Sequence, residues 1–183
     1  MTHVLIIGGT GMLVGVSRWL AEQEGCKISI VGRNPVPMNR LVDSLKAKTK
    51  ITPLLVDYTN STVFREMLSW TIQQNGPIDL VVAWVHSIGE NTLNIVKDEV
   101  SKGGHKWCLF HIIGSSSDLS EIKKEIAIPE NCSYYQIQLG FILEKDHSRW
   151  LTHEEISDGV IEAIKNKRER KIIGVIDPWD KRP

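Results

Sequence analysis

Cysteine is scarce in this chain of 183 residues, which holds three, Cys26, Cys108 and Cys132, far apart in the sequence. An odd and scattered set argues against a disulfide framework and against a zinc site, and it fits a reducing compartment. An excess of charge of either sign is also missing, because 22 Lys and Arg residues balance 22 Asp and Glu residues. We therefore expect no general attraction to nucleic acid or to an anionic membrane.

Long apolar runs, low-complexity tracts and internal repeats are missing as well. No stretch is long enough to cross a bilayer, and the first apolar segment begins too close to Met1 to leave room for a signal peptide. We therefore expect a cytoplasmic protein with no membrane partner. The six histidines show no spacing typical of metal ligands, so no metal is expected.

What the chain does contain is a regular alternation of short apolar runs and helical patterns. The runs are rich in β-branched residues, which is typical of parallel strands buried on both faces. Strands are expected at His3–Ile7, Lys27–Val31, Ile51–Val56, Ile78–Trp84, Trp107–Ile113, Ser133–Ile142 and Lys171–Ile176. Helices are expected at Met12–Glu24, Val36–Ala47, Ser61–Gln74, Asn91–Lys102 and Leu119–Glu125, and after a capping box formed by Thr152 and Glu155.

This alternation predicts a single α/β domain over residues 1–183, with no linker to a second domain. The domain is expected to be a doubly wound, mostly parallel sheet of about seven strands flanked by helices. An irregular tail at residues 177–183 is expected to lie across the carboxyl edge of the sheet or on a partner subunit.

The first strand runs directly into a glycine-rich turn, and an amphipathic helix follows. Such a turn presents bare backbone N–H groups and a helix N-terminus to one point, which favours a phosphate group. Glycines keep side chains away, so that the backbone can approach a pyrophosphate closely. The sequence therefore predicts a dinucleotide site at Gly8, Gly9, Thr10, Gly11, Met12 and Leu13, although the same glycines could form a purely structural turn.

The loops after the second and third strands are expected to contact the adenosine half of the cofactor. An NAD site usually places a carboxylate after the second strand, whereas this chain has Gly32, Arg33 and Asn34. A guanidinium can pair with a 2′-phosphate, so we predict NADP(H), with NAD(H) as the weaker ligand. Asp57, beside Tyr58, is either an adenine contact or a turn and helix cap, and Arg33 is otherwise a solvated loop residue.

The fourth strand ends with Ala83, Trp84, Val85 and His86, which would reach the nicotinamide end of the same edge. For Trp84 the alternative is a core residue, and for His86 a hydrogen-bonded loop histidine. The basic run from Lys165 to Lys171 follows the last helix, where cations complement the helix dipole. We interpret that run as a solvated helix end and expect no nucleic-acid partner.

Taken together, these motifs resemble the short-chain dehydrogenase/reductase family, whose members are NAD(P)-binding oxidoreductases with a Rossmann fold. The turn at Gly8–Leu13 is similar to the glycine motif of the extended and atypical branches, and Gly32-Arg33-Asn34 to an NADP-type second-strand ending. Asp57 matches the adenine-contacting aspartate of the family. Gly114-Ser115-Ser116 resembles its catalytic-serine segment, and Gln138–Ile142 its proline–glycine segment without the proline.

The chain departs from the family in three places. Val14 stands where the third motif glycine is expected, with Gly15 one place later, and the asparagine-rich end of the fourth strand is replaced. The catalytic Tyr-x-x-x-Lys is missing, because the residues four places after Tyr58, Tyr134 and Tyr135 are Thr62, Gln138 and Leu139. We interpret Tyr134 and Tyr135 as packing residues on a strand.

The missing pair leaves open which group supplies the proton that carbonyl reduction requires. Ser115 and His86 are the candidate catalytic residues, and Ser115 and Ser116 could instead cap the short helix that follows. The resemblance implies an NADP(H)-dependent oxidoreductase acting on a small molecule, and a homodimer or tetramer. The alternative is a non-catalytic NADP(H)-binding sensor or interaction module.

Overall fold

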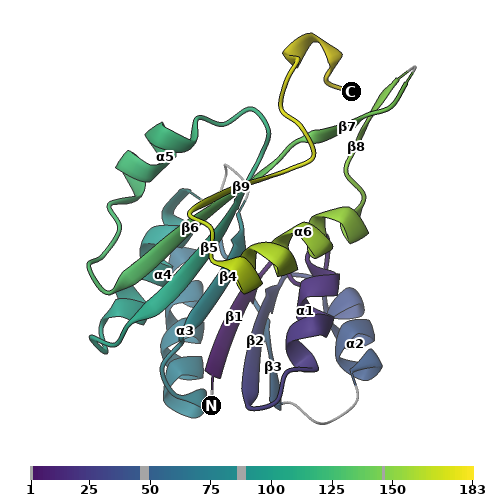
Figure 1. Ribbon diagram of the computed structural model, residues 1–183. Helices are drawn as coiled ribbons and strands as arrows, with labels where there is room; N and C mark the ends of the chain where they lie inside the picture. The colour runs from purple at the N-terminus through teal and green to yellow at the C-terminus, as the bar shows by residue number, and fades with distance from the viewer. Residues whose placement is uncertain (1, 46–49, 86–89, 146) are drawn as a thin grey trace.

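The computed structural model describes residues 2–45, 50–85, 90–145 and 147–183. Seven parallel strands form one sheet in the order β3-β2-β1-β4-β5-β6-β9 (Figure 1). Their bounds are β1 Thr2–Ile7, β2 Cys26–Gly32, β3 Lys50–Leu55, β4 Leu80–Trp84, β5 Trp107–Ile113, β6 Cys132–Leu139 and β9 Arg170–Ile173. The order reverses between β1 and β4, which is the switch point where ligands bind in open α/β sheets.

Helices cover both faces of this sheet (Figure 1). They are α1 Val14–Ala21, α2 Pro35–Ser44, α3 Ser61–Asn75, α4 Glu90–Ser101, α5 Leu119–Ile126 and α6 His153–Asn166. Alternate strand residues point to opposite faces, so that Val4 and Ile6 join the apolar cluster beneath α1, α2 and α6. Leu5 and Ile7 join the cluster beneath α3, α4 and α5. The predicted α/β doubly wound fold is confirmed.

The predicted long strand Ser133–Ile142 is wrong, because the chain leaves the sheet at Gly140. β6 ends at Leu139, and Phe141–Leu143 forms β7, which pairs antiparallel with β8, Ser148–Trp150. The Val175 backbone crosses Gly140 so closely that a Cβ there would overlap its carbonyl. Only glycine fits this crossing, and the strand direction changes there.

The chain after β9 turns back over the carboxyl edge of the sheet. Gly174 has a φ of +76° and ends the strand before the predicted Ile176. Val175 and Phe141 then exchange two backbone hydrogen bonds of 2.9 Å, so the tail lies beside β7. Trp179–Lys181 forms the short helix η2. We call β7, β8 and residues 174–183 the hairpin–tail lobe; it rises beyond the sheet in Figure 1.

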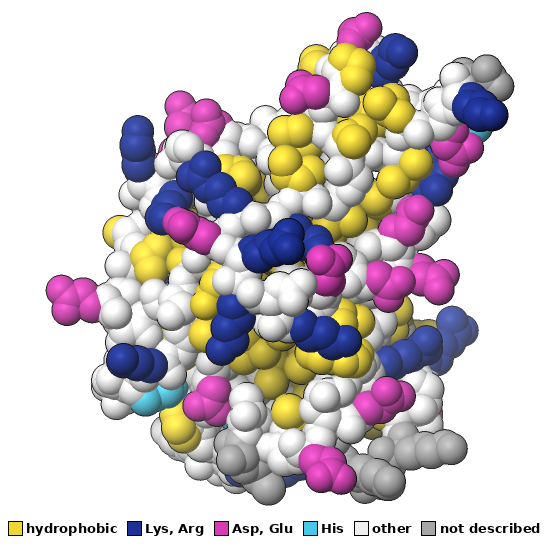
Figure 2. Space-filling model, viewed as in Figure 1, with side chains coloured by type: hydrophobic (Ala, Val, Ile, Leu, Met, Phe, Trp, Pro, Cys, Tyr) yellow, Lys and Arg dark blue, Asp and Glu magenta, His cyan; other side chains and the backbone are white. Residues whose placement is uncertain are grey.

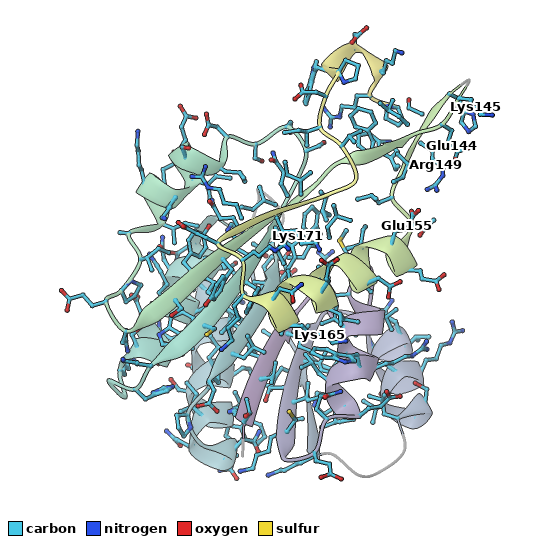
Figure 3. The ribbon with its side chains drawn as sticks, in the orientation of Figure 1. Glu144, Lys145, Arg149, Glu155, Lys165 and Lys171 are labelled. Atoms are coloured by element: carbon cyan, nitrogen blue, oxygen red, sulfur yellow. The ribbon has the colours of Figure 1, made fainter. Side chains whose placement is uncertain are left out.

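The basic run from Lys165 to Lys171 spans the end of α6 and the start of β9, and two of its lysines contact neighbouring side chains. The Lys165 ammonium lies 5.4 Å from the ring centre of Trp19, and Lys171 pairs with Glu162 at 2.5 Å (Figure 3). The carboxylate–ammonium pair with Lys171 lowers the pKa of Glu162. Lys165 thus lies in the last turn of α6, whereas Lys171 belongs to β9.

Candidate cofactor and substrate clefts

The glycine loop between β1 and α1 keeps several backbone donors free. Gly8 has a φ of +88°, and its carbonyl accepts the Gly11 amide at 3.2 Å, while Gly11 accepts the Val14 amide at 3.0 Å. Within the described part of the chain, the amides of Thr10, Met12 and Leu13 donate to no protein acceptor. Unpaired amides at a helix N-terminus form a site for an anion.

These turns also correct the predicted start of the first helix. We expected it at Met12–Glu24, but the residues before Val14 are held in the turn and α1 covers only Val14–Ala21. The helix therefore begins two residues later, and its first amide, that of Val14, donates to the Gly11 carbonyl of the loop.

The glycines of the loop have different tasks. A Cβ on Gly9 would lie 2.7 Å from Ser17 Oγ and 2.9 Å from the Ile30 side chain, so Gly9 lets α1 approach the sheet. Ser17 Oγ donates to the Gly9 carbonyl at 2.9 Å and fixes that approach. A Cβ on Gly11 would meet only the Gly8 carbonyl, at 3.9 Å, so Gly11 leaves open space. Close helix–sheet packing is thus achieved without a glycine at Val14.

A first cleft of about 490 Å³ lies over this loop at the switch point of the sheet. Its walls come from the glycine loop, from the end of β2 and from three residues of other segments. They are Gly8, Thr10, Gly11, Met12, Val31, Gly32, Arg33, Tyr58, Trp84 and His153. A Cβ on Gly32 would lie 3.2 Å from Met38 and 3.3 Å from Thr10 Oγ1, so a small residue keeps this wall open.

Arg33 lies at the edge of the first cleft with most of its side chain in water. It is 63% exposed, and its guanidinium lies 3.7 Å from the Asp57 carboxylate. Asp57 mainly accepts the amide and hydroxyl of Thr59, at 3.0 and 2.8 Å, and these hydrogen bonds lower the pKa of the Asp57 carboxyl. Asp57 thus organises a turn, and its side chain does not line the cleft.

A second cleft of about 310 Å³ adjoins the first. The two share Met12, Trp84 and His153 as walls, so they are halves of one depression along the carboxyl edge. The remaining walls come from the loop after β5, from the end of β6 and from the segments that cover the edge. They are Gly114, Ser115, Ser116, Leu139, Gly140, Trp150, Leu151, Ile156 and Arg182.

Ser115 and Ser116 line the second cleft and do not cap α5. Asp118 caps that helix by accepting the amides of Ser120 and Glu121 at 2.7 and 3.1 Å, which lowers the pKa of the Asp118 carboxyl. Gln138 Nε2 donates to the carbonyls of Ser115 and Ser117, at 3.3 and 3.0 Å, and anchors the serine loop to β6. The serines are therefore held beside the cleft.

Several predicted site residues have side chains outside both clefts. Asn34 caps α2 by accepting the Val36 amide at 2.9 Å, while Gly9, Leu13 and Ala83 are buried in the packing of the fold. The Ala83 methyl points into the cluster beneath α3 and α4, because its place in the alternation of β4 faces away from the cleft. His86 lies outside the described residues.

The two tyrosines of β6 are packing residues, as expected. Tyr134 OH lies 2.9 Å from Nδ1 of the buried His111, and burial raises the pKa of Tyr134. Tyr135 stacks on Phe110 with ring centres 4.5 Å apart. Neither residue lines the first or the second cleft.

Sequence analysis did not identify four of the residues that line the clefts, because segments distant in the sequence bring them to the carboxyl edge of the sheet. These residues are Trp150, Leu151, His153 and Arg182. Arg149 joins the hairpin to α6 (Figure 3): its guanidinium donates to Glu144 at 2.8 Å and to Glu155 at 2.9 and 3.0 Å. Arg149 and the Thr152 amide lower the pKa of Glu155 to about 2. The predicted capping box of Thr152 and Glu155 is present, and it was the one signal that placed His153 at the start of a helix.

No helix in the described ranges is long and apolar enough to cross a membrane. No group of three or more His, Cys, Asp and Glu side chains in the same ranges is arranged to hold a metal ion.

Comparison with known proteins finds similarity at the level of structure only. No family model matches the sequence, and no curated protein matches it. An alcohol dehydrogenase from the archaeon Thermococcus sibiricus, complexed with 5-hydroxy-NADP, superposes with a TM-score of 0.72 at 13% identity, covering 96% of each chain.

Two further solved structures are similar. A short-chain type dehydrogenase/reductase from Mycobacterium marinum gives a TM-score of 0.74 at 16% identity, covering 94% of this chain and 93% of the other. A short-chain dehydrogenase/reductase from Burkholderia phymatum in complex with NAD gives 0.74 at 11% identity, covering 97% and 89%. With the strand order and the switch-point cleft, these matches show that the chain has the fold of the short-chain dehydrogenases/reductases.

Proposed function

We propose that this chain is an NADP(H)-dependent oxidoreductase that acts on a small molecule. The observation that carries the proposal is the pair of joined clefts, of which the first contains a glycine loop with free amide donors. A dinucleotide would place its diphosphate on that loop and its nicotinamide near Trp84, where the clefts meet. Complexes of similarly folded proteins with 5-hydroxy-NADP and NAD support this choice of ligand class.

Arg33 supports the preference for NADP(H) over NAD(H). Its side chain is exposed at the rim of the first cleft, and the 3.7 Å contact with Asp57 is too long for a strong hydrogen-bonded pair. A guanidinium in this state can exchange a weak partner for a dianionic phosphate, to which it donates two charge-assisted hydrogen bonds. Tyr58 lies on the same wall and offers a ring for the adenine.

Replacing Arg33 by aspartate tests the cofactor preference. Charge-assisted hydrogen bonds contribute about 1.5–3 kcal/mol, so we expect NADPH affinity to fall by roughly 10- to 100-fold in Arg33→Asp while NADH affinity changes much less. Calorimetric titration of both cofactors measures the ratio. Arg40, on α2 and outside the cleft, provides the control Arg40→Asp, which should leave both affinities unchanged. Equal losses for NADPH and NADH in Arg33→Asp would remove Arg33 from phosphate recognition.

Bound NADPH would supply a hydride, and the chain would have to supply the proton that a carbonyl oxygen takes up as it becomes an alcohol. Among the side chains that line the second cleft, Ser115 and Ser116 offer hydroxyl groups and His153 offers an imidazole. Ser115 also lies on a loop that Gln138 holds in place. We assign Ser115 to hydrogen bonding with the acceptor oxygen and His153 to proton supply. Acceptors such as quinones and flavins need less acid assistance, and positioning alone could suffice for them.

Turnover against a panel of quinones, flavins and aldehydes tests whether this arrangement catalyses a reaction. We expect NADPH oxidation with at least one acceptor, and a fall in kcat of at least about tenfold in Ser115→Ala. Ser117→Ala is the matched control, because Ser117 belongs to the same loop but does not line the cleft. Tight NADPH binding without turnover across the panel would favour a nucleotide-binding sensor, and equal effects of the two variants would contradict the role of Ser115.

A further inference from the structure

The hairpin–tail lobe contains two arginines in opposite electrostatic settings. Arg149 is saturated, because it donates to both Glu144 and Glu155 (Figure 3). Arg182 has no carboxylate within 4.0 Å among the residues that the structure describes. Within one small lobe, one guanidinium thus has a structural role and the other keeps its hydrogen-bonding edge free.

Arg182 is held by aromatic faces instead of by charges. Its guanidinium carbon lies 5.0 Å from the ring centre of Trp150 and 4.7 Å from that of Trp179. Such stacking orients the guanidinium plane but leaves its N–H groups available. The two tryptophans are 46% and 52% exposed, and hydrophobic side chains gather on the lobe (Figure 2).

The free guanidinium of Arg182 lies beside the second cleft. Arg182 lines the second cleft together with Trp150. The other walls include apolar side chains such as Met12, Leu139 and Ile156, the serine loop and His153, and no carboxylate lies among them. An apolar slot with one free guanidinium at its rim is suited to a molecule with an apolar body and one anionic end.

We propose that the second cleft selects small molecules with an apolar body and one carboxylate, which is bound by the free edge of Arg182. The inference rests on the proposed function, since it makes the second cleft the acceptor site beside the cofactor. The body of the ligand would lie between Met12, Leu139 and Trp150, with its reactive end toward Ser115 and Trp84. Recognition of charge by Arg182 and delivery of hydride would thus occur at opposite ends of the cleft.

A matched pair of probes tests this selectivity. Calorimetry with NADP⁺-saturated protein would compare 2-naphthoate with 2-naphthamide, which has nearly the same shape and no charge. We expect the carboxylate to bind at least about tenfold more tightly than the amide. In Arg182→Gln the two affinities should become equal. Arg182→Lys should keep part of the preference, because it retains the charge but not the bidentate edge.

Lys181→Gln is the matched control, because it removes the same charge one residue away and Lys181 does not line the cleft. It should keep the full preference for 2-naphthoate, and thermal melts should show all three variants folded. Equal affinities of the two probes in the wild type, an unchanged preference in Arg182→Gln, or no binding of either probe at millimolar concentration would overturn the proposal.

Titrating NADPH alone separates the failure of the carboxylate site from the failure of the proposed function. NADPH binding without probe discrimination refutes only the carboxylate site. Selective carboxylate binding without NADPH binding refutes only the cofactor assignment.

Discussion

A Gly11→Asp variant is expected to lose dinucleotide binding while it keeps its fold. A Cβ at Gly11 has no neighbour closer than the Gly8 carbonyl at 3.9 Å, so the side chain enters open space. Its carboxylate would stand where we place the diphosphate, and like charges at such distances cost several kcal/mol. NADPH affinity should therefore fall by at least about a hundredfold. Calorimetry measures the affinity, and a melting curve without ligand should stay close to that of the wild type.

Gly9→Ala, in the same loop, is the converse control, because its main effect should be on stability. Its methyl group would lie within 3 Å of Ser17 Oγ and of the Ile6 and Ile30 side chains, so α1 would have to shift from the sheet. Overpacking of this kind costs about 1–3 kcal/mol, which lowers the melting temperature by several degrees in a domain of this size. If Gly11→Asp bound NADPH as tightly as the wild type, the glycine loop would not be the diphosphate site.

The second large effect is expected in the pH dependence of stability, through His111. This side chain is 8% exposed on β5, and burial lowers the pKa of His111 from 6.5 to about 4 in the folded protein. Below pH 6.5 the unfolded chain takes up a proton that the folded protein refuses, so stability falls as the pH falls toward 4. The free energy of unfolding should drop by about 2 kcal/mol between pH 7 and pH 5 from this residue. Buried His3, whose pKa is also lowered by burial, adds a loss of the same sign.

Urea unfolding at the two pH values measures this loss, and His111→Gln should remove the part that His111 causes. Glutamine keeps a polar group opposite Tyr134 OH, which lies 2.9 Å from the imidazole in the wild type. His147→Gln serves as the control, because His147 is exposed in the fold and its side chain stays in water on unfolding. Identical losses in the wild type and in His111→Gln would show that folding does not change proton uptake by His111, which contradicts the expected effect.

The fold followed from local sequence patterns, since the strands of the sheet and the helices between them have clear apolar periodicity. β3 was identified despite Pro53, because an edge strand tolerates a residue without a backbone donor. The glycine loop was also found, since its function depends on residues adjacent in the sequence. These features are determined within short segments, where sequence patterns are informative.

The second cleft could not be predicted, because its walls depend on contacts between distant segments. The strand ends at Gly140 only because the Val175 backbone crosses it, and no local sequence pattern links these two residues. Arg182 gained its place through stacking on Trp150 and Trp179, which is again a tertiary effect. Asp57 organises a turn and Asn34 caps α2, because each side chain accepts a hydrogen bond from a backbone amide two residues further along the chain.

The central place of β1 has a consequence for biosynthesis. Val4 and Ile6 pair with β2 on one side, but on the other side Val4 pairs with Leu80 of β4. One flank of this strongly apolar strand therefore stays without its neighbour until α3 and β4 have left the ribosome. An unpaired strand flank in a nascent chain invites association with other chains. Slow translation between β3 and β4 should therefore reduce the yield of folded protein more than a similar delay after β5. A shortage of a chaperone should reduce the yield for the same reason.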